Sequence, residues 1–253
     1  LDFLLAELAK RKMKAIIYFS NNWEWSGGFL QYLNWNGQIA DSVLRRKLGW
    51  DEMRDLVSGF YQCNPCISQY EAQLKLLVNR TNSITKKPYK DDPAIMAWEI
   101  ANEPRPMRPV MIDAYKKFIH QTATLIRSLD PNHLVTTGTE GDMGTENMDV
   151  FRSIHEDKAI DYLTIHIWPK NWGWFSDTAI GKSFDKVLEN TGAYIKRHTA
   201  VAIELKKPLV IEEFGLPRDQ HAFTTESSTR LRDRYYAFVF DYLADPEKNA
   251  GVI

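Results

Sequence analysis

The chain has 253 residues, a net charge of −1 and no long run of one charge sign. This length suits a single domain, and 44% hydrophobic and 26% charged residues are typical of a globular protein. The balanced charge argues against a nucleic-acid or anionic-membrane partner. The longest apolar runs have the length of strands, so no membrane-spanning helix is expected.

The start of the chain resembles neither a secretion signal nor a natural initiation site. The sequence opens with Leu1-Asp2-Phe3-Leu4-Leu5, without Met, without a basic start and without a cleavage site. We therefore expect a processed chain or a fragment, and the start excludes no compartment.

Helical and strand patterns alternate along the chain. Apolar residues spaced three and four apart predict helices, short apolar runs next to turn residues predict strands, and the polar-aromatic stretch 29–66 is expected to hold short helical pieces. The expected order is helix 2–12, strand 14–19, helix 67–83, strand 94–100, helix 109–129, strand 133–137, helix 147–155, strand 162–167, helix 181–205, strand 209–212, helix 226–243 and the start of a strand at 251–253.

This alternation predicts an α/β fold with a parallel sheet and covering helices. A closed barrel of this class needs eight strands. The pattern supplies five and the start of a sixth, so the sheet is either open or part of a barrel.

Two motifs carry most of the chemical information. Trp98-Glu99-Ile100-Ala101-Asn102-Glu103-Pro104 and Val210-Ile211-Glu212-Glu213-Phe214-Gly215 are both apolar runs that reach glutamates and then a Pro or Gly. Such a run is typical of a buried strand that brings a carboxylate to its C-terminal end. Two carboxylates on separate strands are what two-carboxylate glycoside hydrolysis requires.

Other polar residues also follow expected strands, on the face where barrel enzymes have their active sites. Asn22 follows the first strand, Asn102 the second, Glu140 the third, and His166 and Trp168 the fourth. In an eight-stranded ring the strands of Glu103 and Glu213 would lie nearly opposite each other, and the carboxylates could then be about 5 Å apart, as a retaining mechanism requires.

Several tryptophans and the two cysteines leave alternatives open. Tryptophans in polar loops pack against the loop or stack on sugar rings, and as a group they favour sugar binding; these are Trp23, Trp25, Trp35, Trp168, Trp172 and Trp174. Cys63 and Cys66 are expected to be structural thiols or a local disulfide, because a redox motif would follow a clear strand and a zinc site would need a second pair.

Asn102-Glu103-Pro104, His166-Ile167-Trp168 and Glu213-Phe214-Gly215 together resemble glycoside hydrolase family 5. Arg105, the loop Ser20 to Trp23 and the stretch His166 to Trp174 resemble its endo-β-1,4-mannanases in particular. The resemblance runs from about residue 2 to 253. It implies a (β/α)8 TIM barrel, expected here as one domain over 1–253 that lacks the first two strands and the end of the last strand. The missing strands would carry an arginine of the catalytic site and a tryptophan of the sugar site.

The resemblance also implies residue roles. Glu103 would be the acid/base and Glu213 the nucleophile, while Asn102 would donate to a sugar 2-hydroxyl and Arg105 would lie on the aglycone side. His166 would orient a carboxylate or contact sugar, and Trp168 would lie near the nucleophile. Further substrate contacts are expected from Asn22, Glu140, Trp172 and Trp174.

Competing interpretations remain for some of these residues. Glu99 and Glu212 lie on the same strands and are either buried ion-pair members or, for Glu212, a rival nucleophile. Glu140 either lines the cleft or caps a loop, and a histidine at a strand end is often structural.

The expected protein is therefore a retaining endo-β-1,4-mannanase that acts on mannan, glucomannan or galactomannan. A β-1,4-glucanase of the same family and a carbohydrate-binding pseudoenzyme are the alternatives. A metal-dependent hydrolase on the same barrel is a further alternative, which no His-x-His or His/Asp cluster at the expected strand ends supports. We expect a monomer without metal or cofactor, whose partner is β-mannan, and family resemblance implies a secreted or periplasmic location.

Overall fold

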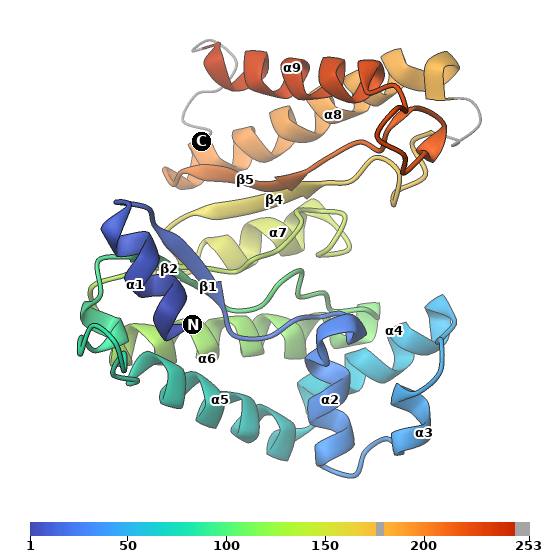
Figure 1. Ribbon diagram of the computed structural model, residues 1–253. Helices are drawn as coiled ribbons and strands as arrows, with labels where there is room; N and C mark the ends of the chain where they lie inside the picture. The colour runs from blue at the N-terminus through green and yellow to red at the C-terminus, as the bar shows by residue number, and fades with distance from the viewer. Residues whose placement is uncertain (176–179, 246–253) are drawn as a thin grey trace. The chain divides into compact units, whose positions relative to one another are not determined.

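The computed structural model describes residues 1–175 and 180–245 (Figure 1). The chain folds into two compact units, Leu1–Asp161 and Tyr162–Ile253, which are taken one at a time below. The single domain expected from the sequence stays a prediction, and the strand expected at 251–253 lies outside the described residues. Among the described helices, none combines the length and apolar character needed to cross a bilayer.

The first unit is a three-stranded parallel sheet with helices. Its strands are β1 (Ala15–Tyr18), β2 (Ile95–Glu99) and β3 (Leu134–Thr136). Its helices are α1 (Asp2–Lys10), α2 (Gly28–Trp35), α3 (Asp41–Leu44), α4 (Trp50–Ser58), α5 (Asn64–Val78), α6 (Ile112–Leu129) and α7 (Met148–His155), with 3-10 turns η1 (Glu24–Ser26), η2 (Gly59–Gln62), η3 (Tyr89–Asp91) and η4 (Pro109–Met111).

The strands pair in chain order, β1 with β2 and β2 with β3, and all run parallel. Glu99 is level with Tyr18 on one side and with Thr136 on the other. A parallel bridge between Asn21 and Asn102 continues the β1–β2 ladder beyond both strands. The loops after the strands therefore begin at one edge of the sheet, where polar residues were expected.

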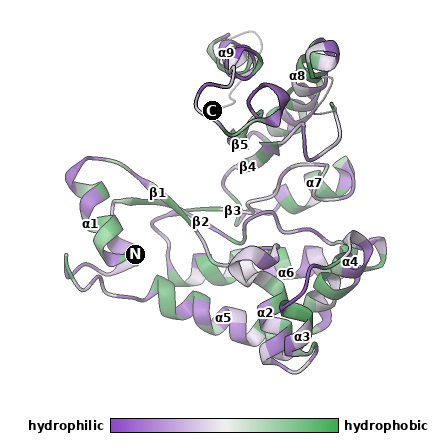
Figure 2. Cartoon of the chain, turned by 45° about the vertical axis from the view of Figure 1, so that its right-hand side comes forward, coloured by the Kyte–Doolittle hydropathy of each residue, from purple (hydrophilic) through white to green (hydrophobic). Residues whose placement is uncertain are grey.

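Helices α5 and α6 run side by side along one side of this sheet (Figure 1). Both alternate between hydrophobic and hydrophilic residues, as expected of helices with one buried face (Figure 2). Aromatic rings fill the core. Phe29 stacks on Phe60 with ring centroids 4.2 Å apart, and Phe118 lies edge-on to Phe60 with ring centroids 5.4 Å apart. The hydroxyl of Tyr70 on α5 donates to the carbonyl of Ile100 at 2.7 Å, which ties the helix to the end of β2.

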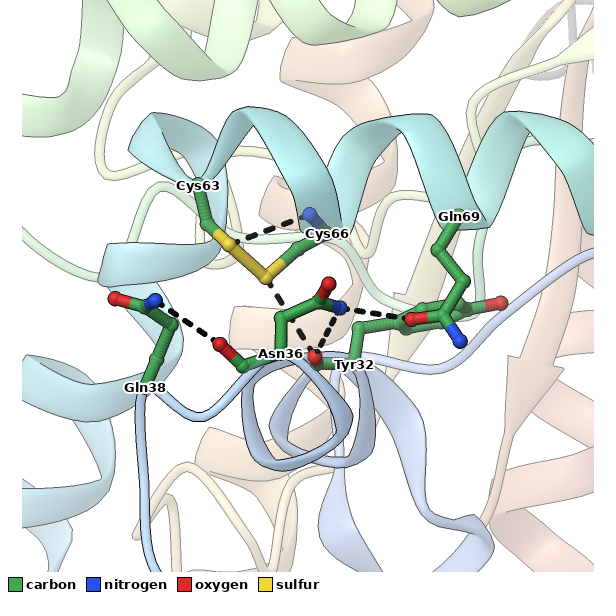
Figure 3. The surroundings of a disulfide bond; sticks show 6 residues. All are labelled: Tyr32, Asn36, Gln38, Cys63, Cys66 and Gln69. Carbon is green, nitrogen blue, oxygen red and sulfur yellow. Dashed lines mark hydrogen bonds between the residues drawn. A yellow bond between two sulfur atoms is a disulfide. The ribbon is translucent and has the colours of Figure 1, made fainter.

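A disulfide joins Cys63 and Cys66 at the start of α5 (Figure 3). The Cys63 sulfur accepts a hydrogen bond from the Cys66 backbone N–H, and the Cys66 sulfur lies 3.5 Å from the carbonyl oxygen of Tyr32 on α2. Both cysteines are buried in the core, which confirms the structural interpretation in its disulfide form.

The second unit contains β4 (Leu163–Ile167), β5 (Leu209–Phe214), α8 (Ile180–Leu205), α9 (Arg230–Ala244) and the turn η5 (Asp219–His221). The strands pair in parallel, and both helices lie on the same side of them (Figure 1). Phe184 of α8, Tyr235 of α9 and Phe214 of β5 belong to one apolar cluster. The α/β fold with parallel strands is thus confirmed within each unit.

Most element boundaries agree with expectation within a few residues, and the helix expected at 67–83 differs most. It begins at Asn64, because Cys63 caps its first turn and Pro65 favours a first-turn position. It ends at Val78, because the Asn82 side chain accepts from the backbone N–H groups of Ile84 and Thr85 and forms a tight turn instead.

Asp130, fully buried at the end of α6, joins β2 to β3. Its carboxylate accepts from Trp98 Nε1 at 2.6 Å, from His133 Nδ1 at 2.7 Å and from the backbone N–H groups of Asn132 and His133. Burial raises the pKa of Asp130, but the hydrogen bonds from Trp98 and His133 lower it by a larger amount. The pKa of Asp130 therefore lies below its ordinary value. The folded state therefore favours the charged carboxylate.

Replacing Asp130 with Asn should lower the free energy of unfolding at pH 7 by about 2–3 kcal/mol, because charged hydrogen bonds are lost inside the core. Because its pKa is lower in the folded state, charged Asp130 stabilises the fold at pH values above its unfolded-state pKa of about 3.9. This stabilisation is lost as the pH falls through the folded-state pKa. The difference between wild type and variant in urea denaturation should therefore shrink below about pH 4. Asp113→Asn, on the exposed first turn of α6, is the control and should cost less than about 1 kcal/mol.

Candidate active site

Glu103 occupies a constrained backbone position just beyond β2. Its φ is +52°, in the left-handed region that residues other than glycine seldom adopt. Its N–H donates to the carbonyl of Gly138 at 2.8 Å. A Cβ on Gly138 would lie 2.1 Å from the Ala101 carbonyl oxygen and 2.3 Å from Glu99 Oε1, so only glycine fits there. The strained turn is thus held in place by the loop after β3.

Two buried tyrosines hold the carbonyl groups that follow Glu103. Tyr115 donates to the Pro104 oxygen at 3.2 Å, and Tyr61 donates to the Arg105 oxygen at 2.8 Å. Burial raises the pKa of both phenols above the ordinary value, so both remain protonated donors. The chain therefore leaves Glu103 along a fixed path.

The side chain of Glu103 is buried and accepts a hydrogen bond from the indole N–H of Trp23. Trp23 lies in the loop after β1, where Asn21 Oδ1 accepts from its backbone N–H at 3.1 Å. Its ring stacks on the exposed Trp25 with centroids 5.4 Å apart and lies 6.2 Å from the half-exposed Trp50. Glu103 is thus an oriented carboxyl beside an aromatic surface.

Arg105 and Glu140 form a two-pronged ion pair in which the Glu140 side chain is buried and that of Arg105 is partly exposed. Arg105 Nε is 2.5 Å from Glu140 Oε2, and its second nitrogen donates to Oε1 at 2.7 Å. The guanidinium also lies over Trp23, 5.0 Å from the ring centroid. Glu140 therefore orients Arg105, a role that differs from the two expected for it, lining the cleft or capping a loop. Direct sugar contact by either residue stays a prediction.

Asn102 and Asn22 hold the two loops together. Asn102 Nδ2 donates one of its two amide hydrogens to Asn21 Oδ1 at 3.2 Å, and its expected contact with a sugar hydroxyl stays a prediction. Asn22 is fully buried, and its Oδ1 accepts from the Arg105 backbone N–H at 3.3 Å. Asn22 thus connects the loop after β1 to the loop after β2, and its expected sugar contact stays a prediction.

In the second unit, Glu213 lies near the end of β5 and faces donors from β4 and its loop. Trp168 Nε1 donates to Glu213 Oε2 at 3.0 Å, and His166 Nδ1 is 3.4 Å from the same oxygen. A Cβ on Gly215 would lie 2.7 Å from the Trp168 ring, so glycine lets the indole approach β5. The Glu213 side chain is 38% exposed, which leaves its carboxylate accessible.

Trp172 and Trp174 pack against α8. Their ring centroids lie 5.0 and 6.1 Å from that of the buried Tyr194, and 5.1 Å from each other. Both rings remain partly exposed. The structure gives them a packing role, and their contact with sugar stays a prediction.

Sequence reasoning placed Trp23 among candidate sugar-binding tryptophans but not among the residues at Glu103. It also gave no role to Trp50. The sequence signal for Trp23 is the loop Ser20-Asn21-Asn22-Trp23 directly after a strand. This loop comes level with Asn102 and Glu103 only when β1 and β2 pair in parallel, which the sequence alone does not show.

Comparison with known proteins agrees with these motifs. A family model described as glycoside hydrolase family 5 β-mannosidase-like matches residues 1–253. The chain is 30% identical to a mannan endo-1,4-beta-mannosidase of Solanum lycopersicum over 99% of its length. A glycoside hydrolase family 5 mannosidase from Rhizomucor miehei is 29% identical, with a TM-score of 0.84, over 99% of this chain and 62% of that one.

A second solved structure, the endo-1,4-beta-D-mannanase of Thermotoga petrophila, is 25% identical with a TM-score of 0.77, over 99% of this chain and 66% of that one. The chain spans about 60% of the length of the curated relatives it matches. The resemblance inferred from the motifs is thereby confirmed.

Replacing Arg105 with Met should lower the free energy of unfolding by about 3 kcal/mol, because the buried Glu140 carboxylate then loses the guanidinium that lies against it. The double variant Arg105→Met/Glu140→Gln should be less destabilised than the sum of the single variants, since it removes both charges. Urea denaturation of the four proteins measures the coupling. Additive effects would contradict the pairing.

Proposed function

Because the chain belongs to glycoside hydrolase family 5, we propose that it is the catalytic part of a retaining endo-β-1,4-mannanase. The observation that carries the proposal is that Glu103 and Glu213 each follow or end a parallel strand and each accept an indole hydrogen bond. The proposal includes the (β/α)8 barrel of the family, of which the two parallel sheets would be parts. Its substrates would be mannan, glucomannan or galactomannan.

In the proposed first step, Glu213 attacks the anomeric carbon of the sugar. Glu103, protonated, gives its proton to the leaving glycosidic oxygen, and a glycosyl–enzyme ester forms. In the second step Glu103, now a carboxylate, takes a proton from water, which attacks the anomeric carbon and releases Glu213. Configuration is retained because two displacements each invert it.

The ordered side chains support this division of roles. The hydrogen bond from Trp168 and the approach of His166 suit a carboxylate that must remain charged and correctly oriented before it attacks. Burial of Glu103 suits a group that must be protonated in one step, because burial disfavours a charge. Asn102 would donate an amide hydrogen to the 2-hydroxyl of the sugar, a contact that strengthens in the transition state.

A secreted or periplasmic monomer remains part of the proposal. The buried Cys63–Cys66 disulfide supports the location, because disulfides persist in oxidising compartments and are uncommon in the cytosol.

Glu213→Gln in the full-length protein should lower mannan hydrolysis by at least about a thousandfold, because an amide cannot form the glycosyl ester. Reducing-sugar release from mannan measures this loss, with Glu189→Gln, an exposed residue of α8, as the control. Unchanged hydrolysis by the Glu213 variant would exclude the mechanism. Parallel assays on β-1,4-glucan distinguish a glucanase from a mannanase. A wild-type protein that is inactive on both polysaccharides indicates a pseudoenzyme. Activity that persists in EDTA excludes a metal-dependent hydrolase.

Glu103→Ala should separate the acid role from the nucleophile role. With mannan its activity should fall by about a hundredfold or more, whereas with a dinitrophenyl mannoside the first step should survive, because that leaving group needs no proton. A burst of dinitrophenol followed by slow turnover is the expected time course. Glu71→Ala on α5 is the matched control, and equal losses on both substrates would contradict the assignment.

A further inference from the structure

The β4–β5 ladder contains an irregularity at Glu212. Ile165 pairs with Ile211, but the next residue, His166, pairs with Glu213, so β5 has one extra residue at this point. Ile211 and Phe214 both pack against the apolar cluster formed with α8 and α9, although residues three apart in a regular strand point to opposite faces. The bulge therefore turns Glu212 and Glu213 together away from the helices, as bulges beside active sites often do.

Both carboxylates consequently flank His166. The Nδ1 atom of His166 is 3.4 Å from Glu213 Oε2, and its Nε2 atom is 3.6 Å from Glu212 Oε2. The side chains of His166 and Glu212 are 2% and 9% exposed, whereas that of Glu213 is 38% exposed. Glu213 is thus the carboxylate that a substrate can reach, and Glu212 lies behind the histidine.

Building on the proposed function, we propose that Glu212 is a positioning residue that keeps His166 doubly protonated, with its Nδ1–H directed at the nucleophile Glu213. Glu212 would act through His166 and would not touch the substrate. The interpretation of Glu212 as a rival nucleophile is thereby replaced by a role in support of Glu213.

The chemistry of imidazole carries the argument. A neutral ring has one N–H donor and one acceptor, so either tautomer would turn a lone pair toward a carboxylate oxygen. The imidazolium has donors on both nitrogens and suits both neighbours. A buried carboxylate also needs a partner, and within the described part of the chain no hydrogen bond to either Glu212 oxygen is found. The imidazolium is the charge that compensates it.

The direct test is nitrogen NMR of the full-length protein labelled at its histidines, with the His166 signals assigned from their loss in His166→Gln. In the wild type at pH 7 both ring nitrogens of His166 should carry protons. In Glu212→Gln one of them should lose its proton, while Glu212→Asp, which keeps the charge, should restore at least part of the doubly protonated form. Glu189→Gln makes the same chemical change on exposed α8 and should have no effect.

A neutral His166 in the wild type, or the same protonation in wild type and Glu212→Gln, would overturn the inference. A neutral His166 in the wild type overturns the inference even if the Glu212 variants do not fold.

Kinetics on mannan supply the second readout. Glu212→Gln should lower kcat by about tenfold with little change in KM, because a charged hydrogen bond to Glu213 is replaced by a neutral one. A wild type that hydrolyses no mannan would defeat the proposed function, while the NMR comparison would still decide the Glu212–His166 pairing. Normal hydrolysis with unchanged kcat in Glu212→Gln would defeat the inference alone.

Discussion

Parallel pairing of consecutive strands is the constraint on which both carboxylates depend. When one strand runs beside the next in the same direction, the loop after the first begins beside the end of the second. Trp23, after β1, thereby reaches Glu103, after β2, and Trp168, after β4, reaches Glu213 on β5. The same local arrangement thus occurs twice, once in each unit. An indole N–H from the loop after one strand donates to the carboxylate at the end of the next strand and orients it.

This arrangement is sensitive to close backbone approach. Gly138 lets the loop after β3 meet Ala101 and Glu99, and Gly215 lets Trp168 lie against β5. In both places a single methyl group would collide with backbone or with a ring. The glycine in the Glu213-Phe214-Gly215 motif therefore has a steric reason that is independent of its turn-forming tendency.

Much of the fold follows from local sequence patterns. Helix α6 and strands β2 and β4 lie within a few residues of their expected bounds, because each combines a clear apolar period with a Pro, Asp or Gly at its end. The strand-end positions of Glu103 and Glu213 follow from the same patterns. The end of α5 was missed because the competing turn depends on the Asn82 side chain, whose hydrogen bonds leave no periodic trace.

The contacts between loops were less predictable. The pairing of Arg105 with Glu140, and of Trp23 with Glu103, joins residues from loops after different strands, so it depends on strand register rather than on any local pattern. Trp172 and Trp174 have the same polar surroundings as a sugar-binding tryptophan, yet Tyr194 of α8 lies beside them.

The bulge at Glu212 shows why spacing alone could not separate the two glutamates of β5. In a regular strand Glu212 and Glu213 would face opposite sides, and only one would lie beside His166. The extra residue brings both to the histidine and separates them by depth instead, with Glu212 buried and Glu213 accessible. An attacking group must reach a sugar, whereas a buried charge can act only on its neighbour. The geometry of one strand therefore gives adjacent, chemically identical residues different capacities.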